Sequence, residues 1–465
     1  MRAKSLAVAA TVAALAATGL TLPLAGTAAA ATALRDDFNG DGYRDLAIGT
    51  PKANAVTVTF GSASGVSPSR SVTVTQDTAE VPGVTEAGDE FGENVTSADV
   101  NGDGFADLIV GAPGEKVDGK PDGSMTLVWG SSGGFTKGGM VLNAPTAEDI
   151  RFGEGASFID LDGDGYGNLV VVGANRFWWY ADGVPDGGAI GLEGEGLPAG
   201  VRLEGVTGAD FTDSGNGGQY AVYGKRADGG GYLALVPGGP GDVGHGLRVL
   251  AAGPDRRAAS ETAATGDVNG DGYPDLVTGN RAHNLVTVWY GSSQGLGEAR
   301  GDETYTQDEP GVPGTTEPGD GFGASVSVGD VDGDGAADVA VGAPGETVGS
   351  TTRVGNVVLL KGHKTGTSGL GAGTSWHQGT AGVPGTPEAD DHFGSTVRLK
   401  DINRNGRADL ATAAIGEDIS TAVDAGAVWV LRGTATGLTT SYATSFNGSD
   451  FGIGGAGRGF GDVLR

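Results

Sequence analysis

A nine-residue segment with Asp or Asn at alternate positions recurs along the 465-residue chain, at intervals of 50 to 71 residues. Residues 99–107 read Asp-Val-Asn-Gly-Asp-Gly-Phe-Ala-Asp, with side-chain oxygens at positions 1, 3, 5 and 9. Gly104 stands at position 6, where a tight turn favours a residue without a Cβ atom. Calcium ions take about six to eight oxygen ligands, which such a loop can supply from side chains and one backbone carbonyl. The spacing therefore predicts a calcium loop.

The surroundings of this loop are not those of an EF-hand. An EF-hand closes with a Glu at position 12 and lies between helices. Here residues 95–100 and 108–110 have the composition of short β segments. We therefore expect the loop at the tip of a β-hairpin.

Six copies of the loop are intact, so a chance cluster of solvated Asp turns is a poor explanation. A copy around Asp210 has lost the register, and the copy that starts at Asp401 has only two carboxylates and is predicted to bind most weakly. We expect about five or six bound Ca²⁺ ions. The predicted metal ligands at positions 1, 3, 5, 7 and 9, with position 7 acting through its backbone carbonyl, are Asp37, Asn39, Asp41, Tyr43, Asp45, Asp99, Asn101, Asp103, Phe105, Asp107, Asp160, Asp162, Asp164, Tyr166, Asn168, Asp267, Asn269, Asp271, Tyr273, Asp275, Asp330, Asp332, Asp334, Ala336, Asp338, Asp401, Asn403, Asn405, Arg407 and Asp409.

Each loop lies within a longer repeat. A Phe-Gly pair such as Phe91-Gly92 lies eight residues before several of the loops, and an apolar strand that ends in Gly-Ala-Pro follows, as at 108–113. A third strand and a weaker fourth segment complete each unit. Ninety Gly and 19 Pro residues agree with many turns and short strands. The pattern predicts an all-β fold, a seven-bladed β-propeller with calcium-binding hairpin loops.

The two ends of the chain complement each other. The first loop lacks a preceding Phe-Gly strand, whereas the chain ends in Phe460-Gly-Asp-Val-Leu-Arg465. We expect the propeller to span 34–465, with the first blade completed by 459–465, which pair beside residues 46–48 and close the ring.

With these motifs in place, the chain resembles the FG-GAP repeats of the integrin alpha-subunit propeller and their secreted bacterial relatives. The resemblance is strongest in the second and sixth units, whereas Ala259-Ser260 and Arg202-Leu203 stand where Phe-Gly belongs in the fifth and fourth. It implies calcium in hairpin loops on one face and adhesion or ligand recognition on the opposite face.

Residues 1–33 have a basic start, an apolar stretch and a small-residue exit, which predicts a signal peptide. An uncleaved membrane anchor is the alternative, but Gly19 and Pro23 favour removal. We therefore expect a secreted, extracellular protein with no membrane insertion after signal removal. The chain contains no Cys, so we expect calcium to take the place of disulfides.

A formal net charge of −29 argues against nucleic acid and anionic membranes as partners. An extracellular protein or glycan ligand is expected instead, on the face opposite the calcium loops. Arg300-Gly-Asp302 matches a tripeptide that integrins recognise, but a chance match is expected at this composition. Phe177-Trp-Trp-Tyr180 is interpreted as packing between blades rather than as a sugar platform.

We do not expect an enzyme. The chain has no Cys nucleophile, and its five His residues show no zinc spacing. The alternative function is an extracellular calcium-dependent polysaccharide lyase or hydrolase, because a channel site assembled from distant blades would leave no local motif.

Overall fold

The computed structural model describes residues 33–465 except 118, 121, 147, 181–196, 216, 239–245, 260 and 365–368. Residues 33–465 form one compact unit. The predicted signal peptide lies almost wholly outside the described residues. Among the described residues, no helix is both long and apolar enough to span a membrane.

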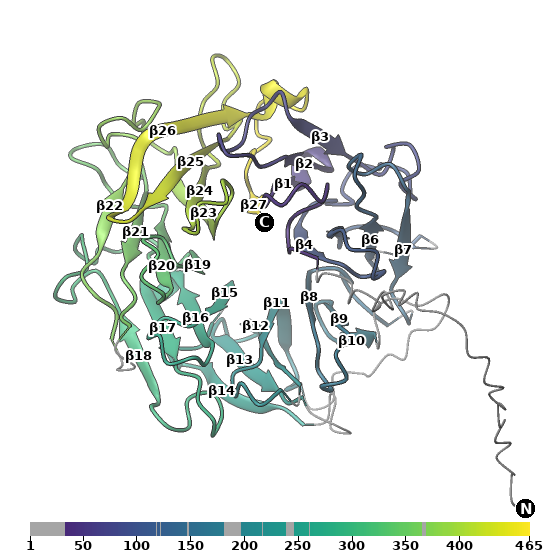
Figure 1. Ribbon diagram of the computed structural model, residues 1–465, viewed down its shortest axis with the longest axis horizontal. Helices are drawn as coiled ribbons and strands as arrows, with labels where there is room; N and C mark the ends of the chain where they lie inside the picture. Colours follow the sequence, from purple (N-terminus) through teal and green to yellow (C-terminus); the bar gives the residue numbers. More distant parts are fainter. Residues whose placement is uncertain are drawn as a thin grey trace, which may run out of the picture. The chain divides into compact units, whose positions relative to one another are not determined.

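Seven antiparallel sheets surround a central axis (Figure 1), as predicted for a seven-bladed propeller. The first blade contains β27 (Val463–Leu464), β1 (Leu46–Thr50), β2 (Ala55–Thr59) and β3 (Ser71–Val74), and the second contains β4 (Asn94–Ala98), β5 (Asp107–Ala112), β6 (Ser124–Val128) and β7 (Gly139–Asn143). The third blade contains β8 (Gly155–Ile159), β9 (Asn168–Val172) and β10 (Phe177–Tyr180). The fourth contains β11 (Val201–Ala209), β12 (Gln219–Arg226), β13 (Gly231–Val236) and β14 (Arg248–Gly253).

The last three blades each contain four strands. The fifth blade contains β15 (Thr262–Gly266), β16 (Asp275–Asn280), β17 (Leu285–Trp289) and β18 (Asp302–Tyr305). The sixth contains β19 (Ser325–Gly329), β20 (Asp338–Ala343), β21 (Asn356–Leu360) and β22 (Thr374–Trp376). The seventh contains β23 (Phe393–Lys400), β24 (Asp409–Ala414), β25 (Ala427–Thr434) and β26 (Gly437–Asn447). The helical segments among the described residues are three short 3-10 turns, η1 (Pro51–Ala53), η2 (Arg281–His283) and η3 (Gly448–Phe451).

The hydrophobic core lies between neighbouring blades. Every residue of β5, β16, β20 and β24, the second strands of four blades, is buried. A strand buried on both faces needs a continuous apolar run, which explains sequences such as Leu-Ile-Val-Gly-Ala in β5. In the third blade, Phe177 and Trp178 of β10 pack into different core clusters. The interpretation of these rings as packing between blades is confirmed.

The Phe-Gly and Gly-Ala-Pro motifs meet at the contact between blades. The phenyl rings of Phe91, Phe152, Phe322, Phe393 and Phe460 are fully buried, and burial of one such ring contributes about 1.5–3 kcal/mol. A Cβ atom on Gly111, in β5, would lie 2.0 Å from the carbonyl oxygen of Gly153, which enters the next blade. The same clash would arise at Gly49, Gly279 and Gly342. Both glycines of the repeat therefore permit close backbone packing between blades.

The C-terminal strand closes the ring, as predicted. Strand β27 pairs with β1, with Ile48 opposite Leu464 and Gly49 opposite Val463. The backbones of Ala47 and Arg465 exchange two hydrogen bonds of 2.8 Å. Figure 1 shows the C-terminus beside the first blade. The propeller is thus closed by hydrogen bonds between the two ends of the described chain.

Candidate metal loops

The predicted metal loops connect the innermost strand of a blade to its second strand. In the second blade, Ala98 of β4 pairs with Asp107 of β5, so the nine-residue loop is the tip of this hairpin. The loops after β8, β15, β19 and β23 occupy the same place. In the first blade, the loop precedes β1, because the inner strand comes from the C-terminus. The structure therefore brings each predicted set of ligands to a hairpin or its equivalent.

The Asp at position 1 holds the turn together in every intact copy. Its Oδ2 atom accepts a hydrogen bond from the backbone N–H of the Gly at position 6, at 2.8 to 3.0 Å. In the second blade these residues are Asp99 and Gly104, and the φ of Gly104 is 90°. Position 1 is therefore a structural residue as well as a predicted ligand.

The Asp at position 9 is buried and joins its hairpin to the end of the third strand. Asp107 accepts hydrogen bonds from the backbone N–H groups of Val100 and Gly130, both at 2.9 Å. Equivalent pairs of bonds reach Asp45, Asp275, Asp338 and Asp409. The sequence pattern indicates position 9 only as a ligand. Its second role is not visible there, because Gly130, which donates one of the two hydrogen bonds to Asp107, lies 23 residues away.

Burial dominates the electrostatics of position 9. It raises the pKa of Asp107 to about 7, against the opposing effect of the two backbone donors, and Asp99 and Asp103 add to the increase. The pKa values of Asp45 and Asp275 are raised to about 7 in the same way. A nearby cation would favour the ionised carboxylates of each loop.

Two loops contain acidic clusters that could hold a metal ion. Carboxylate oxygens of Asp160, Asp162 and Asp164 lie within 4.8 Å of one another, and so do those of Asp330, Asp332 and Asp338. In the third blade, Oδ1 of Asp162 is buried and has no hydrogen-bond partner. A buried carboxylate oxygen is unfavourable without a donor or a cation, so the residues present fit a hard divalent ion.

Basic side chains contact several of these carboxylates. Lys137 lies 3.0 Å from Asp103, and Lys361 lies 2.7 Å from Asp332. Arg70 and Arg300 approach Asp41 and Asp271 at 3.7 and 3.6 Å. Each base follows the third strand of the same blade. These ammonium and guanidinium groups partly neutralise the acidic loops.

The charged side chains of the Arg300-Gly-Asp302 tripeptide form ion pairs within the molecule. Arg300 approaches Asp271, and the carboxylate of Asp302 lies 2.8 Å from Arg257. Both charged side chains thus have intramolecular partners, which agrees with the small weight given to this motif.

The seventh-blade loop has a different internal arrangement. Nδ2 of Asn403 donates to both carboxylate oxygens of Asp409, at 2.9 and 2.8 Å. An amide N–H group thus occupies the space between positions 3 and 9, where a cation would need oxygen atoms. Weak binding by this loop stays a prediction, and this contact is a physical reason to expect it.

The degenerate fourth loop keeps part of the turn. Oδ2 of Asp210 accepts a hydrogen bond of 3.1 Å from Gly215, like position 1 of the intact copies. Gly218, which precedes β12, stands where those copies have the buried position 9 residue. This loop therefore lacks the carboxylate that links the hairpin to the third strand.

The opposite face contains three matching turns. The side chain of Gln76 donates to Glu115 at 2.6 Å, and the backbone N–H of Gly114 donates to Asp89 at 3.0 Å. The contacts Gln307–Glu346 and Gln378–Glu417 repeat this arrangement in later blades. The segments before Phe-Gly in these blades therefore share one hydrogen-bonded turn.

Two further turns match the Gly-x-Ser-x-Gly spacing of a hydrolase nucleophile. They are residues 130–134 and 291–295, which follow third strands and lead into turns rather than helices. The serines at the nucleophile position are Ser132 and Ser293. The residue before each of them, Ser131 or Ser292, donates to the carbonyl oxygen of the Gly three residues later and closes the turn. The segments are therefore turns rather than strand-to-helix elbows.

Seven sheets, six of them with an intact acidic loop before the second strand, define a repeat-built β-propeller. The FG-GAP repeat family matches residues 91–141, 260–296, 322–360 and 393–431, and an FG-GAP-like repeat matches 37–110. The chain is an FG-GAP repeat protein that resembles the integrin alpha-subunit propeller.

The chain is similar to curated integrin alpha subunits over part of its length. Integrin alpha-PS3 of Drosophila melanogaster is 38% identical over 88 residues, which are 19% of this chain and 8% of that protein. Integrin alpha-PS5 of the same organism is 32% identical over 160 residues, 34% of this chain and 15% of that protein. Human integrin alpha-11 is 37% identical over 91 residues, 19% of this chain and 8% of that protein. The matches thus span a small part of these longer relatives.

Among solved structures, the BP39L lectin from Burkholderia pseudomallei has a TM-score of 0.47 and 14% sequence identity, over 84% of this chain and 95% of that chain. This likeness is weak.

Proposed function

We propose that this protein is a secreted, calcium-stabilised propeller that acts as an adhesion or ligand-binding module for a protein or a glycan. Residues 1–33 serve as its signal peptide, and residues 34–465 form the propeller. The observation that carries the proposal is the acidic hairpin loop repeated within an integrin-like FG-GAP propeller.

Calcium has a structural role in this proposal. The ligands are positions 1, 3, 5, 7 and 9 of the intact loops, and about five or six ions bind per chain. Each ion supplies positive charge that offsets carboxylate repulsion and fixes the turn. The unpartnered Oδ1 of Asp162 supports this assignment in the third blade. The Asn403–Asp409 contact supports the weakest affinity in the seventh.

Ligand binding is assigned to the face opposite the loops. The turns that precede Phe-Gly and the links between second and third strands lie together there, through contacts such as Gln76–Glu115. Three aliphatic side chains of these segments are open to solvent: Val84 is 66% exposed, Ile150 is 51% exposed and Val423 is 56% exposed. Exposed apolar groups on rigid turns are suited to contact a partner.

The role is binding rather than catalysis, in line with the similarity to integrin alpha subunits. The test is to screen calcium-loaded protein against immobilised glycans and extracellular proteins, and to assay polysaccharides for released products. Saturable binding that Val84→Asp or Val423→Asp weakens, without product release, supports the proposal. Val249→Asp is the matched control, because Val249 is 49% exposed in β14, at the edge of a blade. Product release would select the lyase or hydrolase instead.

Secretion is tested separately. The N-terminal sequence of protein recovered from the culture medium should begin near residue 34. Retention in the membrane fraction with an intact N-terminus would contradict the proposed signal peptide.

A further inference from the structure

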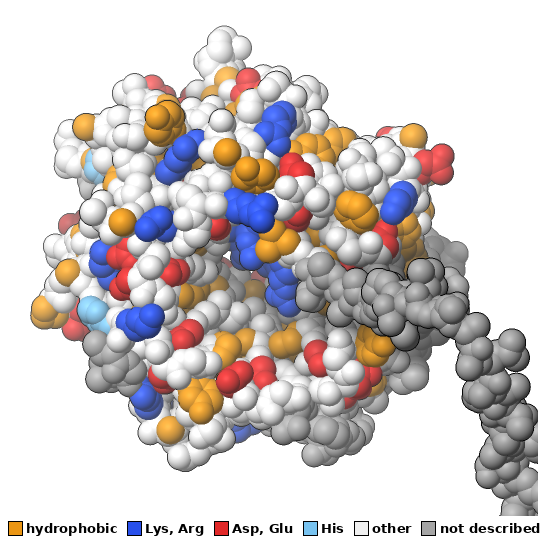
Figure 2. All heavy atoms as spheres, in the orientation of Figure 1, with side chains coloured by type: hydrophobic (Ala, Val, Ile, Leu, Met, Phe, Trp, Pro, Cys, Tyr) orange, Lys and Arg blue, Asp and Glu red, His pale blue; other side chains and the backbone are white. Residues whose placement is uncertain are grey.

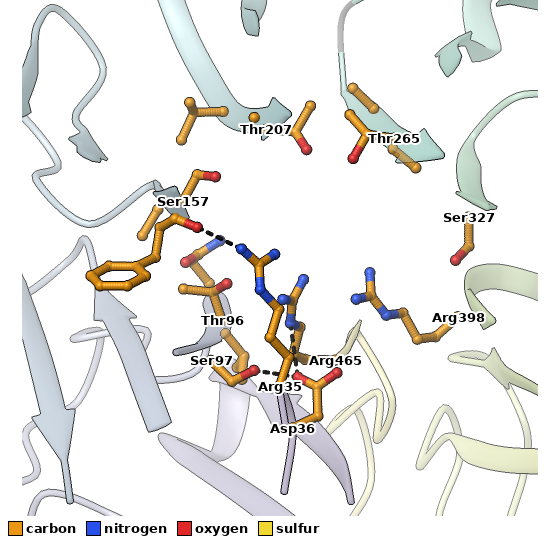
Figure 3. Close-up of a pocket in the computed structure, with 18 of the residues that line it drawn as sticks. Arg35, Asp36, Thr96, Ser97, Ser157, Thr207, Thr265, Ser327, Arg398 and Arg465 are labelled. Carbon is orange, nitrogen blue, oxygen red and sulfur yellow. Dashed lines mark hydrogen bonds and ion pairs between the residues drawn. The ribbon is translucent and has the colours of Figure 1, made fainter. Parts of the chain in front are cut away.

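The inner strands of the blades surround a cavity of about 260 Å³ on the propeller axis. Six different inner strands and both ends of the described chain contribute to its wall. Figure 3 shows the cavity, with basic side chains directed into it. A space of this size accommodates a small molecule rather than a polymer chain.

The wall of this cavity is basic, although the protein as a whole is strongly acidic. Four arginines line it, Arg35, Arg44, Arg398 and Arg465, and the one acidic residue in the wall is Asp36. Figure 2 shows Lys and Arg side chains gathered at the edge of the central opening. Because the chain otherwise has twice as many acidic as basic residues, this local excess of positive charge needs an explanation.

The single carboxylate is already occupied by other cations. Arg465 lies 3.2 Å from Asp36, and Lys400 lies 3.1 Å from it on the buried side. Although burial opposes the effect, Lys400 and Arg465 hold the pKa of Asp36 well below its usual range. Asp36 is therefore an ionised partner of these two groups and leaves the other guanidinium groups uncompensated.

The remaining arginines form no ion pair among the described residues. Arg35 donates to the carbonyl oxygen of Phe158 at 2.9 Å, and Arg44 donates to the carbonyl oxygen of Arg35 at 2.8 Å. Nε of Arg398 is buried and has no hydrogen-bond partner. Burial, together with the positive charge of Arg465, lowers the pKa of Arg398. An anion beside Arg398 would supply the missing partner.

Hydroxyl groups line the cavity across from these arginines. Ser157, Thr207 and Thr265 come from the inner strands of three consecutive blades, β8, β11 and β15. They are partly exposed, and their hydroxyls form no hydrogen bond among the described residues. Figure 3 shows them facing the cavity from the side opposite Arg398. Such hydroxyls can donate to or accept from the hydroxyl groups of a ligand.

We propose that the central channel binds a small hydroxylated organic anion. Its carboxylate lies against Arg398 with Arg35 and Arg44 nearby, since guanidinium groups match the geometry of carboxylates. Its hydroxyl groups contact Ser157, Thr207 and Thr265. This site uses none of the predicted calcium ligands, although Arg44 stands at position 8 of the first loop. It also lies apart from the face assigned to adhesion, so its failure leaves the proposed function untouched.

The path to this site starts on the metal-loop face. A second cavity shares Asp36, Arg44 and Arg398 with the first and extends between Asp330 and Asp401 of neighbouring loops. A ligand can thus reach the channel without crossing the turns of the opposite face.

The experiment is calorimetric titration of the calcium-loaded full chain with glucuronate, glucose and sulfate at constant ionic strength. We expect saturable binding of glucuronate and none of glucose. Arg398→Gln should weaken glucuronate binding at least tenfold, and Thr207→Val should weaken it less. Arg281→Gln is the matched control for charge, because Arg281 is exposed and, among the described residues, its one ion pair is with Glu261, at 3.7 Å. It should bind glucuronate like the unaltered protein.

Thermal melts of Arg398→Gln separate lost binding from lost folding. Without ligand, this variant should melt no lower than the unaltered protein, because a buried Nε–H group without a hydrogen-bond partner is removed. Absence of saturable glucuronate binding, binding of sulfate alone, or unchanged affinity in folded Arg398→Gln would each overturn the proposal.

Discussion

Asp36 and Arg465, which are 429 residues apart in the sequence, form an ion pair of 3.2 Å at the centre of the propeller. The same carboxylate lies 3.1 Å from Lys400 of β23, in the last blade. Backbone hydrogen bonds between Ala47 and Arg465 run alongside this pair. The closure of the ring therefore combines a strand pairing with a buried charge cluster that faces the channel.

The C-terminal segment should contribute a large share of the stability. Phe460 is fully buried and packs against Phe451 and Phe446, with ring centroids 5.5 and 6.5 Å away. Phe460→Ala should lower the free energy of unfolding by about 3–5 kcal/mol, and deletion of 459–465 should lower it further. Urea denaturation measures both. Tyr442→Ala, at a side chain that is 78% exposed, is the control and should cost much less. A deletion variant as stable as the full chain would contradict strand-based closure.

Positions 5 and 9 of a loop should respond differently to calcium. Asp107→Asn replaces an acceptor of two backbone N–H groups with a side chain that offers only one acceptor, at a cost of about 1–3 kcal/mol. Asn168, which occupies position 9 of the loop in the third blade, illustrates this loss of hydrogen bonding, because its Nδ2 atom is buried and has no hydrogen-bond partner. Asp103→Asn removes a charge from a partly exposed position.

Thermal melts with and without chelator separate the two effects. Asp107→Asn should melt lower under both conditions, whereas Asp103→Asn should melt lower only in calcium. An equal decrease in melting temperature for the two variants in chelator would contradict the structural role of position 9.

The two kinds of glycine in the repeat should tolerate Ala to different degrees. Gly104 has a φ of 90° but open space where its Cβ would lie, so Gly104→Ala should cost about 1–3 kcal/mol through backbone strain. Gly111→Ala places a Cβ 2.0 Å from the backbone of the next blade, which cannot rotate away. It should lower the melting temperature more than Gly104→Ala. The reverse order would show that blade contacts are looser than described.

The seventh loop should become more dependent on calcium when its amide is removed. In Asn403→Asp, the two hydrogen bonds to Asp409 are replaced by repulsion between carboxylates. The variant should therefore melt lower than the unaltered protein in chelator and recover in calcium. Asn405→Asp is the control, because Asn405 makes no hydrogen bond to Asp409 among the described residues. If the melting temperature of Asn403→Asp equalled that of the unaltered protein both in chelator and in calcium, the loop would hold no cation in the variant or in the unaltered protein.

The hairpin loops and the buried second strands could be predicted because each depends on residues that lie close together in the sequence. The closing strand could be predicted because the first repeat lacks one strand and the C-terminal segment matches it. The role of position 9 could not be predicted, since Asp107 and Gly130 meet only after the third strand packs. The amide bridge from Asn403 to Asp409 likewise depends on side-chain direction. The basic channel combines Arg35 with Arg398 and Arg465, which lie 363 and 430 residues further along the chain.

The most direct test of the account is calorimetric titration of chelator-treated protein with Ca²⁺, paired with thermal melts. The loops predict about five or six bound ions and a marked rise in melting temperature. Absence of saturable calcium binding, together with an unchanged melting temperature in excess chelator, would contradict the central claim that cations hold these acidic turns.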